Sequence, residues 1–403
     1  MEWKEVTLGD FMQCNPKRAI KKGQKARKIT MDLLIPHSKT IRNWNYEPYS
    51  GGAKFQNGDT IMARITPCLE NGKHAFVSIL DKGEIAYGST EYFVFCGKEE
   101  VSDNDFVYYL TKTPLFRDTA IKSMVGSSGR QRAQMDVLEN LKMLVPKDIS
   151  DQRRIASILS SLDRKIELNN KINADLEEMA QAIFKNWFVD FEPFKDGKFV
   201  DSELGMIPEG WKVGSLGDMG TIVCGKTPSK ANSIYYGGDI PFIKIPDMHG
   251  NVFVESSEDR LTEEGSLSQI KKLIPPYSLM VSCIATVGLV SINTKPSHTN
   301  QQINTVIPHN KSALFYLYQH IKNNEGFLKN MGRGGTTTLN VNTKSFSNIR
   351  LLIPSEIALE QFHGIVEGLF KKIEQNLHES RTLSLLRDTL LPRLMSGELE
   401  VPE

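Results

Sequence analysis

Leu-Lys-Met-Leu-Val-Pro, at residues 141–146, leads into a long stretch of helical spacing, and the same plan returns as Ile-Arg-Leu-Leu-Ile-Pro at residues 349–354. A second match has the same offset of 208 residues: Trp-Lys-Glu-Val-Thr-Leu-Gly-Asp at 3–10 returns as Trp-Lys-Val-Gly-Ser-Leu-Gly-Asp at 211–218. Two matches at one offset indicate an internal duplication. Each copy is predicted to contain a mixed α/β module, a proline and a long helix.

The two helical stretches have the spacing of a coiled coil. From about Ser150 to Trp187 the seam residues recur in alternating steps of four and three, and the same steps return from Phe362 to Leu394. This 3.5-residue period predicts that the helices pack against each other. Because a whole module lies between them in the sequence, we expect them to be antiparallel. The alternative is two separate surface helices, each packed on its own module.

Both predicted seams become polar at matching positions. The four helix-pairing candidates are Asn169, Asn173, Asn376 and Ser380. If a pseudo-twofold axis relates the helices, these side chains meet in one buried layer, which fixes the register at some cost in stability. Arg387 also falls on the second seam, and the neighbouring Leu386 is the candidate for its inward place.

The predicted fold class is α+β, with two mixed α/β modules separated by two long antiparallel helices that form a coiled coil, and with an internal pseudo-twofold repeat. The predicted segments are a first module at 1–147, a central helical spacer at 148–192, a connector at 193–210, a second module at 211–354, a C-terminal helical spacer at 355–396 and a tail at 397–403. Pro392 interrupts the second helical stretch, which leaves open whether that helix continues past Leu391.

The composition is that of an ordinary globular protein. Hydrophobic residues make up 40% of the 403 residues, and no apolar run approaches the ~20 residues of a membrane-spanning helix. The opening residues lack the features of a signal peptide, so we expect a cytoplasmic protein with no membrane partner. The five cysteines form no C-x-x-C pair and the eight histidines form no paired motif. Neither a disulfide framework nor a metal site is therefore expected.

One motif resembles an active-site element. Gly-Thr-Ile-Val-Cys-Gly-Lys-Thr at 220–227 fits the phosphate-binding P-loop pattern. A true P-loop follows a strand and opens a helix, whereas Thr-Ile-Val is itself strand-like and Pro228 follows the motif directly. We therefore interpret Lys226 as an exposed cation on a loop and keep a P-loop nucleotide-binding enzyme as an alternative function. The sequence offers no catalytic residue that we would name.

Basic loops are the remaining functional candidates. The net charge is only +1, so nucleic-acid binding requires local clusters or partner proteins. Seven cations lie within residues 17–28 and can neutralise phosphates or simply form a solvated surface. Glycine-rich loops at 126–132 and 332–338 occupy matching places and suit the reading of base edges, with structural turns as the alternative. The candidate DNA-binding residues are Lys21, Lys22, Lys25, Arg130, Gln131, Arg132, Lys226, Arg333, Thr336 and Thr337.

With these features, the chain resembles a type I restriction–modification specificity subunit over nearly its whole length. The strings that carry the resemblance lie at residues 63–73, 88–92, 151–155, 186–191, 204–211, 225–229 and 300–302. The resemblance implies that the chain is not an enzyme by itself. It implies two target-recognition domains, at 1–147 and 211–354, which each read half of a split site in double-stranded DNA, and helices that set the distance between them.

The resemblance also implies partners. Two adenine-N6 methyltransferase subunits would dock, one on each half, and endonuclease–translocase subunits would complete the complex. S-adenosylmethionine, ATP and magnesium would belong to those partners, and no cofactor to this chain. A non-catalytic coiled-coil scaffold that pairs other proteins is the second alternative.

Overall fold

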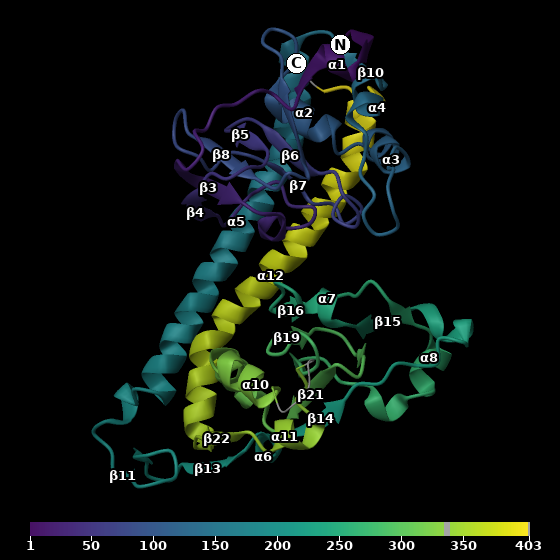
Figure 1. Ribbon diagram of the computed structural model, residues 1–403. Helices are drawn as coiled ribbons and strands as arrows, with labels where there is room; N and C mark the ends of the chain where they lie inside the picture. Colours follow the sequence, from purple (N-terminus) through teal and green to yellow (C-terminus); the bar gives the residue numbers. More distant parts are fainter. Residues whose placement is uncertain (334–338, 402–403) are drawn as a thin grey trace. The chain divides into compact units, whose positions relative to one another are not determined.

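The computed structural model describes residues 1–333 and 339–401, which divide into two compact units (Figure 1). Unit 1 consists of Met1–Leu168 and Ser380–Glu403, and unit 2 of Asn169–Glu379. Two helices of 40 residues, α5 (Ile149–Phe188) and α12 (Glu356–Met395), each contribute one part to each unit. The predicted α+β class and the pairing of two long helices are confirmed.

Unit 1 contains two four-stranded sheets. The first has the order β2 (Met12–Cys14), β9 (Tyr92–Gly97), β6 (Thr60–Ala63), β7 (His74–Phe76), and the second has the order β4 (Asn45–Pro48), β3 (Lys25–Ile29), β8 (Ile85–Gly88), β5 (Lys54–Gln56). Strands β1 (Trp3–Thr7) and β10 (Lys142–Pro146) form a separate antiparallel ladder. The short helices are α1 (Leu8–Phe11), α2 (Asn104–Leu110), α3 (Pro114–Lys122) and α4 (Met135–Glu139).

Unit 2 has a similar plan, with sheets of five and three strands in place of four and four. Its larger sheet has the order β14 (Gly220–Cys224), β21 (Ile303–Pro308), β18 (Leu279–Ser282), β19 (Val290–Asn293), β16 (Phe253–Val254), and its smaller one has the order β17 (Arg260–Leu261), β15 (Tyr236–Ile243), β20 (His298–Thr299). Two ladders pair β11 (Phe199–Val200) with β12 (Ile207–Pro208) and β13 (Lys212–Ser215) with β22 (Arg350–Ile353). The short helices are α6 (Leu216–Met219), α7 (Ile245–Met248), α8 (Glu263–Leu267), α9 (Leu314–Asn323), α10 (Glu325–Met331) and α11 (Thr343–Ser347).

The internal repeat is visible in the strand pairing. The two strings that recur in the sequence pair with each other in each unit, as β1 with β10 and as β13 with β22, and each ladder is followed by a long helix. Each unit has a parallel pair at the corresponding place, β3 with β8 in unit 1 and β15 with β20 in unit 2. The duplication predicted from sequence is therefore a duplication of topology.

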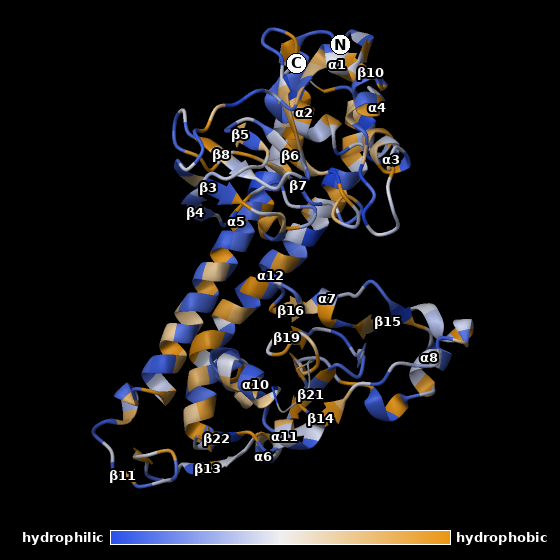
Figure 2. Ribbon diagram, in the orientation of Figure 1, coloured by the Kyte–Doolittle hydropathy of each residue, from blue (hydrophilic) through white to orange (hydrophobic). Residues whose placement is uncertain are grey.

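In unit 1, α12 packs on α5 and on the module beneath it. Leu391 and Leu394 share a buried cluster with Ile155 and Leu159. The helix continues through Pro392 to Met395, which answers the question left open by the sequence. Hydropathy colouring shows hydrophobic residues alternating with hydrophilic ones along both long helices (Figure 2).

The prediction for Leu386 is wrong. Leu386 is 45% exposed, whereas Arg387 is 5% exposed and points inward. The guanidinium enters the core because Asp163 meets it there, with Arg387 Nη1 lying 2.6 Å from Asp163 Oδ1. The Tyr109 hydroxyl donates to the other oxygen of Asp163 at 2.6 Å. Burial alone would lower the pKa of Arg387, but Asp163 and the neighbouring Asp388 together outweigh it and the net shift is upward.

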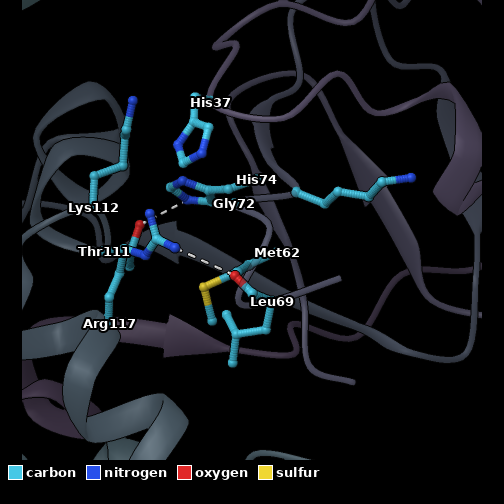
Figure 3. Close-up of a pocket in the computed structure, with 9 residues that line it drawn as sticks. His37, Met62, Leu69, Gly72, His74, Thr111, Lys112 and Arg117 are labelled. Atoms are coloured by element: carbon cyan, nitrogen blue, oxygen red, sulfur yellow. Dashed lines mark hydrogen bonds between the residues drawn. The ribbon is translucent and has the colours of Figure 1, made fainter. Parts of the chain in front are cut away.

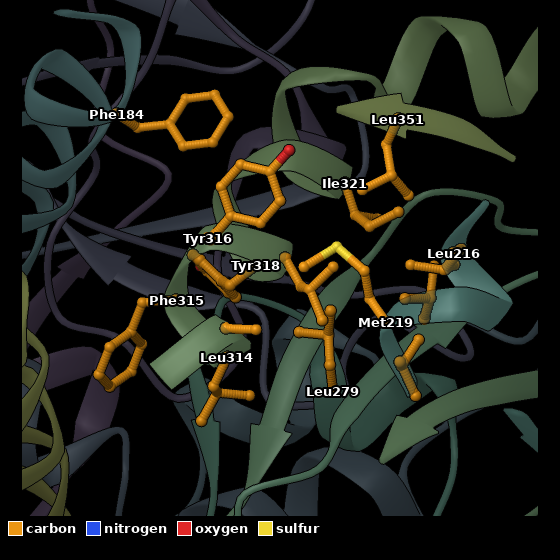
Figure 4. Packing of buried hydrophobic residues seen from close by; sticks show 14 of the residues in the cluster. Phe184, Leu216, Met219, Leu279, Leu314, Phe315, Tyr316, Tyr318, Ile321 and Leu351 are labelled. Carbon is orange, nitrogen blue, oxygen red and sulfur yellow. The ribbon is translucent and has the colours of Figure 1, made fainter. Parts of the chain in front are cut away.

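The core of unit 2 is rich in aromatic side chains, which come from both long helices and from α9. Figure 4 shows some of those from α5 and α9, including Phe184 and Tyr316. Phe188 of α5 lies 4.9 Å from Phe362 of α12 and 4.7 Å from Tyr316 of α9, measured between ring centroids. Phe315 stacks on Phe370 at 4.1 Å. Because Phe184 and Phe188 face Phe362 while Asn173 faces Asn376, the two helices run antiparallel within this unit.

Candidate nucleic-acid interface

Three of the four predicted helix-pairing residues are brought together. In unit 2, Asn376 Nδ2 donates to Asn173 Oδ1 at 2.8 Å, and Asn169 Nδ2 donates to Glu379 Oε2 at 2.8 Å and to the Asn376 carbonyl at 3.4 Å. All three asparagines are buried. Ser380 belongs to unit 1, where it is buried and its carbonyl accepts from the Ser384 hydroxyl at 2.9 Å. The boundary between the units falls at these polar positions in both helices.

The basic stretch at residues 17–28 separates into paired and unpaired cations. Arg18 is bonded to buried Asp59 at 2.9 Å, Arg27 to Asp81 at 2.9 Å, and Lys28 to Glu47 at 2.8 Å. The three lysines singled out from sequence are exposed and form no ion pair with any residue that the structure describes. We call them the lysine cluster: Lys21, Lys22 and Lys25. They present three solvated positive charges beside the second sheet of unit 1.

Arg132 is held by a carboxylate. Its Nε and Nη2 donate to Glu91 at 2.8–3.0 Å, and Arg64 donates to the same carboxylate at 3.3 Å. The hydrogen bond from Arg132 lowers the pKa of Glu91, although burial opposes the shift. Because this pairing uses most of the guanidinium, Arg132 fixes the end of the 126–132 loop to the neighbouring sheet.

Arg130 and Gln131 lie on the outer part of the same loop. Arg130 is exposed, and its side chain makes no hydrogen bond or ion pair within the described ranges. Gln131 is half-buried, and its carbonyl accepts from the Thr66 amide at 3.0 Å. Gly126 and Gly129, with φ of +131° and +76°, supply the backbone conformations that turn the loop. The loop therefore presents one exposed cation, Arg130, next to the anchored Arg132.

In unit 2 the motif at 220–227 does not have the local structure of a P-loop, so the alternative of a P-loop nucleotide-binding enzyme is not supported. Residues 220–224 form strand β14, and the next helical element of the described chain is the single turn Ser233–Tyr235, so no helix opens at the lysine. Gly225 packs against backbone, since a Cβ added there would lie 2.1 Å from the Asn300 carbonyl oxygen. Lys226 is exposed and its amide donates to the Thr299 carbonyl at 2.9 Å. A P-loop needs amides turned toward phosphate, and these residues do not supply them.

Arg333 follows α10 and is exposed, with Nη1 donating to Asn330 Oδ1 at 3.3 Å. Thr336 and Thr337 lie outside the described residues. Within residues 1–333 and 339–401, no group of three or more His, Cys, Asp or Glu side chains could hold a metal ion. In the same ranges no helix combines the length and the apolar character needed to cross a bilayer.

A small cationic pocket in unit 1 has the residues of an active site but not the room (Figure 3). His74 is bonded to Thr111 at 3.0 Å, and burial takes its pKa well below the usual value. Burial also lowers the pKa of Lys112 to about 8, and its Nζ has no hydrogen-bond partner among the described residues. The cavity holds about 10 Å³, the space of a single water. The pocket is therefore too small for a substrate.

Comparison with known proteins then decides the class. The chain matches the model of the type I restriction modification DNA specificity domain over residues 1–178 and 208–383. The chain belongs to this family. It is similar to the HindI specificity subunit of Haemophilus influenzae, with 34% identity over 99% of this chain and 100% of that protein. It is also similar to the MjaIX specificity subunit of Methanocaldococcus jannaschii, with 30% identity over 74% of this chain and 70% of that protein.

The fold agrees with a solved specificity subunit. The crystal structure of a type I restriction–modification S subunit from M. genitalium superposes with a TM-score of 0.53 and 14% identity, covering 98% of this chain and 96% of that one. As a type I specificity subunit, this chain is the non-catalytic, DNA-recognising member of its complex and carries no cofactor itself. This class excludes both the P-loop enzyme and the general protein scaffold.

Sequence reasoning missed one exposed feature of this specificity subunit. Trp44 and Tyr46 flank the start of edge strand β4 and are 42% and 64% exposed. The available signal was two aromatic residues interleaved with Asn43 and Asn45 in a hydrophilic stretch. Such interleaving is common where proteins contact nucleic acid, but it has neither the charge density nor the spacing that drew attention to the basic loops.

Proposed function

We propose that the chain reads a bipartite site in double-stranded DNA, one half through each unit. In this proposal residues 1–147 and 211–354 are the two target-recognition domains, 148–192 and 355–396 are helical spacers, 193–210 is a connector and 397–403 is a tail. The observation that supports it is a similar sheet topology present twice in one chain, with different residues in the corresponding glycine-rich segments at 126–132 and 332–338. Two units that share a fold but differ in their surface residues are suited to recognising two different half-sites.

The proposed contacts follow from exposure and charge. The lysine cluster neutralises phosphates, which positions unit 1 without reading sequence. Arg130 and Gln131 contact base edges, and Arg132 holds their loop in place through Glu91. In unit 2 the proposed contacts are Lys226, Arg333, Thr336 and Thr337.

The proposed partners are two adenine-N6 methyltransferase subunits and the endonuclease subunits. A duplicated chain offers two similar docking surfaces, and two similar surfaces bind two copies of one partner. We propose a pseudo-twofold arrangement of these surfaces, which presents one adenine of each strand to one methyltransferase. S-adenosylmethionine, ATP and magnesium bind to these partners, and the complex works in the cytoplasm, where the DNA lies.

The test is to map methylated adenines in DNA from cells that express this chain with its methyltransferase partner. The expected result is a two-part motif with one modified adenine on each strand. Unmodified DNA, or a single uninterrupted motif, would contradict the proposal. Arg130→Ala is expected to relax the first half of the motif only. Lys198→Ala, which removes an exposed cation of the connector, is the matched control and is expected to leave both halves unchanged.

A further inference from the structure

Edge strand β4 of unit 1 and the three residues before it present exposed side chains, of which Arg42 is paired with Glu167 at 3.3 Å. Residues 42–46, Arg-Asn-Trp-Asn-Tyr, are exposed one after another. Tyr46 is 64% exposed and Trp44 is 42% exposed. Large aromatic side chains at a strand edge cost hydration free energy, so they suggest a surface that is covered in the working complex.

The segment is fixed in place rather than loose. Tyr46 pairs with Arg27 across the antiparallel β3–β4 ladder. The Arg27 guanidinium is bonded to Asp81 at 2.9 Å, lies 3.5 Å from Glu84, and sits 4.8 Å from the centroid of the Trp44 ring. A cation clamped by two carboxylates therefore supports the inner side of the indole and leaves the rest of the ring facing solvent.

One lysine of the cluster lies next to the strand. Lys25 of the lysine cluster lies on β3 opposite Pro48 of β4. Beside it is a hollow of 380 Å³ whose lining includes Tyr46, the cations Lys25 and Arg27, and the carboxylates Asp81 and Glu84. The carboxylates at this edge are already paired, Asp81 and Glu84 with Arg27 and Glu47 with Lys28. Aromatic and amide side chains beside unpaired lysines match the surface of duplex DNA, with phosphates for the lysines and base edges for the others.

The corresponding strand of unit 2 supports the same role. In unit 1, Lys28 of β3 faces Tyr87 of β8, and in unit 2, Phe242 of β15 faces His298 of β20, both in parallel pairs. If Lys28 and Phe242 are equivalent positions, then Arg27 and Pro241, which each precede them by one residue, are equivalent as well. Arg27 pairs with Tyr46 of β4, and Pro241 pairs with Arg260 of β17.

Arg260 therefore occupies the place of Tyr46, and it is exposed as well. By the same register, Glu258 corresponds to Trp44, whereas a β-bulge between Tyr236 and Ile240 interrupts the correspondence before the position of Lys25. One backbone position carries an aromatic residue in one unit and an arginine in the other. Structural roles conserve side-chain chemistry between duplicated units, whereas reading different base pairs requires it to differ.

We propose that edge strands β4 and β17 are specificity-determining elements, which contact base pairs of the first and second half-site respectively. Trp44 and Tyr46 contact the first half-site, and Arg260 contacts a guanine in the second, because a guanidinium reads guanine O6 and N7. The inference rests on the proposed function and adds a second reading element to each unit besides the glycine loops.

The test uses the full chain with its methyltransferase partner. Tyr46→Ala is expected to relax the first half of the methylated motif, and Arg260→Ala the second half, so each variant controls for the other. Discrimination at the affected base pair should fall about 5- to 150-fold, as expected for the loss of one base contact. If either variant leaves the motif unchanged, or weakens both halves equally, the inference is overturned. If the wild-type chain gives no two-part motif, the proposed function itself fails.

A second measurement does not depend on methylation. Trp44 is the most exposed of the four tryptophans, so acrylamide should quench its fluorescence most strongly. The quenchable fraction that is present in the wild type and absent in Trp44→Phe is therefore the signal of Trp44. A duplex with the mapped motif should protect this fraction, while a duplex altered only in the first half-site should protect it less. Equal quenching with and without the specific duplex would overturn the proposal.

Discussion

The buried pair between Arg387 and Asp163 gives a sharp prediction about how α12 is held in unit 1. Their side chains are 6% and 7% exposed, and the charged atoms lie 2.6 Å apart. Replacing Arg387 with Met keeps the apolar length of the side chain and removes the charge. Asp163 is then left as a buried carboxylate whose remaining partner is the Tyr109 hydroxyl.

The expected loss is about 3–5 kcal/mol in the free energy of unfolding, the usual cost of removing one partner of a buried pair. The double variant Arg387→Met with Asp163→Leu removes the stranded charge. It leaves the buried Tyr109 hydroxyl without its acceptor, and Asp388, which also loses Arg387, is 59% exposed and stays hydrated. That hydroxyl costs about 1–3 kcal/mol. The double variant should therefore be more stable than the single variant Arg387→Met.

The assay is urea unfolding of the full chain, combined with hydrogen–deuterium exchange of peptides from residues 380–395. The single variant should speed exchange in these peptides and in their unit 1 neighbours, with no change in peptides from β18 and β21. Leu386→Met, at an exposed neighbouring position, is the control and should be neutral. A loss below 1 kcal/mol in Arg387→Met, or a double variant less stable than the single one, would refute the reasoning.

Three further predictions concern the surface and the small pocket. Replacing all three residues of the lysine cluster with Gln should weaken binding to all DNA sequences alike. It should also reduce the slope of log affinity against log salt by about 3, measured by fluorescence anisotropy. An unchanged slope would show that these lysines do not contact phosphates. Glu91→Gln should release Arg132 and loosen the loop that carries Arg130. The expected signs are faster hydrogen exchange at residues 126–132 and less selective recognition of the first half-site. Unchanged exchange would contradict the anchoring role of Glu91. Burial lowers the pKa of Lys112 to about 8 in the folded state, so the unfolded chain binds more protons than the folded one between pH 8 and about 10.4. The free energy of unfolding should therefore rise with pH in this range. Urea unfolding should show this rise in the wild type and not in Lys112→Met.

The long helices could be predicted because their signal is local. A seam of alternating three- and four-residue steps is written within each helix, and the structure places the helices at Ile149–Phe188 and Glu356–Met395. The order of the strands could not be predicted, because a ladder such as β2 with β9 joins residues far apart in the sequence. The periodicity of a strand indicates its exposed face but not its neighbour.

The site shows the same limit. Arg130 and Arg132 look alike in the sequence, yet Glu91, 41 residues before Arg132, holds only the latter. Leu386 looked the better core residue than Arg387 because Asp163, 224 residues earlier, was not considered as its partner. In each case the charge or hydrophobicity of the side chain can be read from the sequence, but its position depends on a partner that is far away along the chain.

The division of the chain into units also affects how a newly made molecule folds. Unit 2 is one continuous stretch, Asn169–Glu379, whereas unit 1 needs residues from both sides of it. The cluster around Ile155 stays incomplete until Leu391, Leu394 and Met395 have been synthesised. At ~5–20 residues per second, the ribosome takes about 10–50 s to travel from residue 168 to residue 395. Unit 2 is therefore completed before unit 1, although most of unit 1 is synthesised first. During that interval the unfinished unit 1 is exposed to chaperones and proteases.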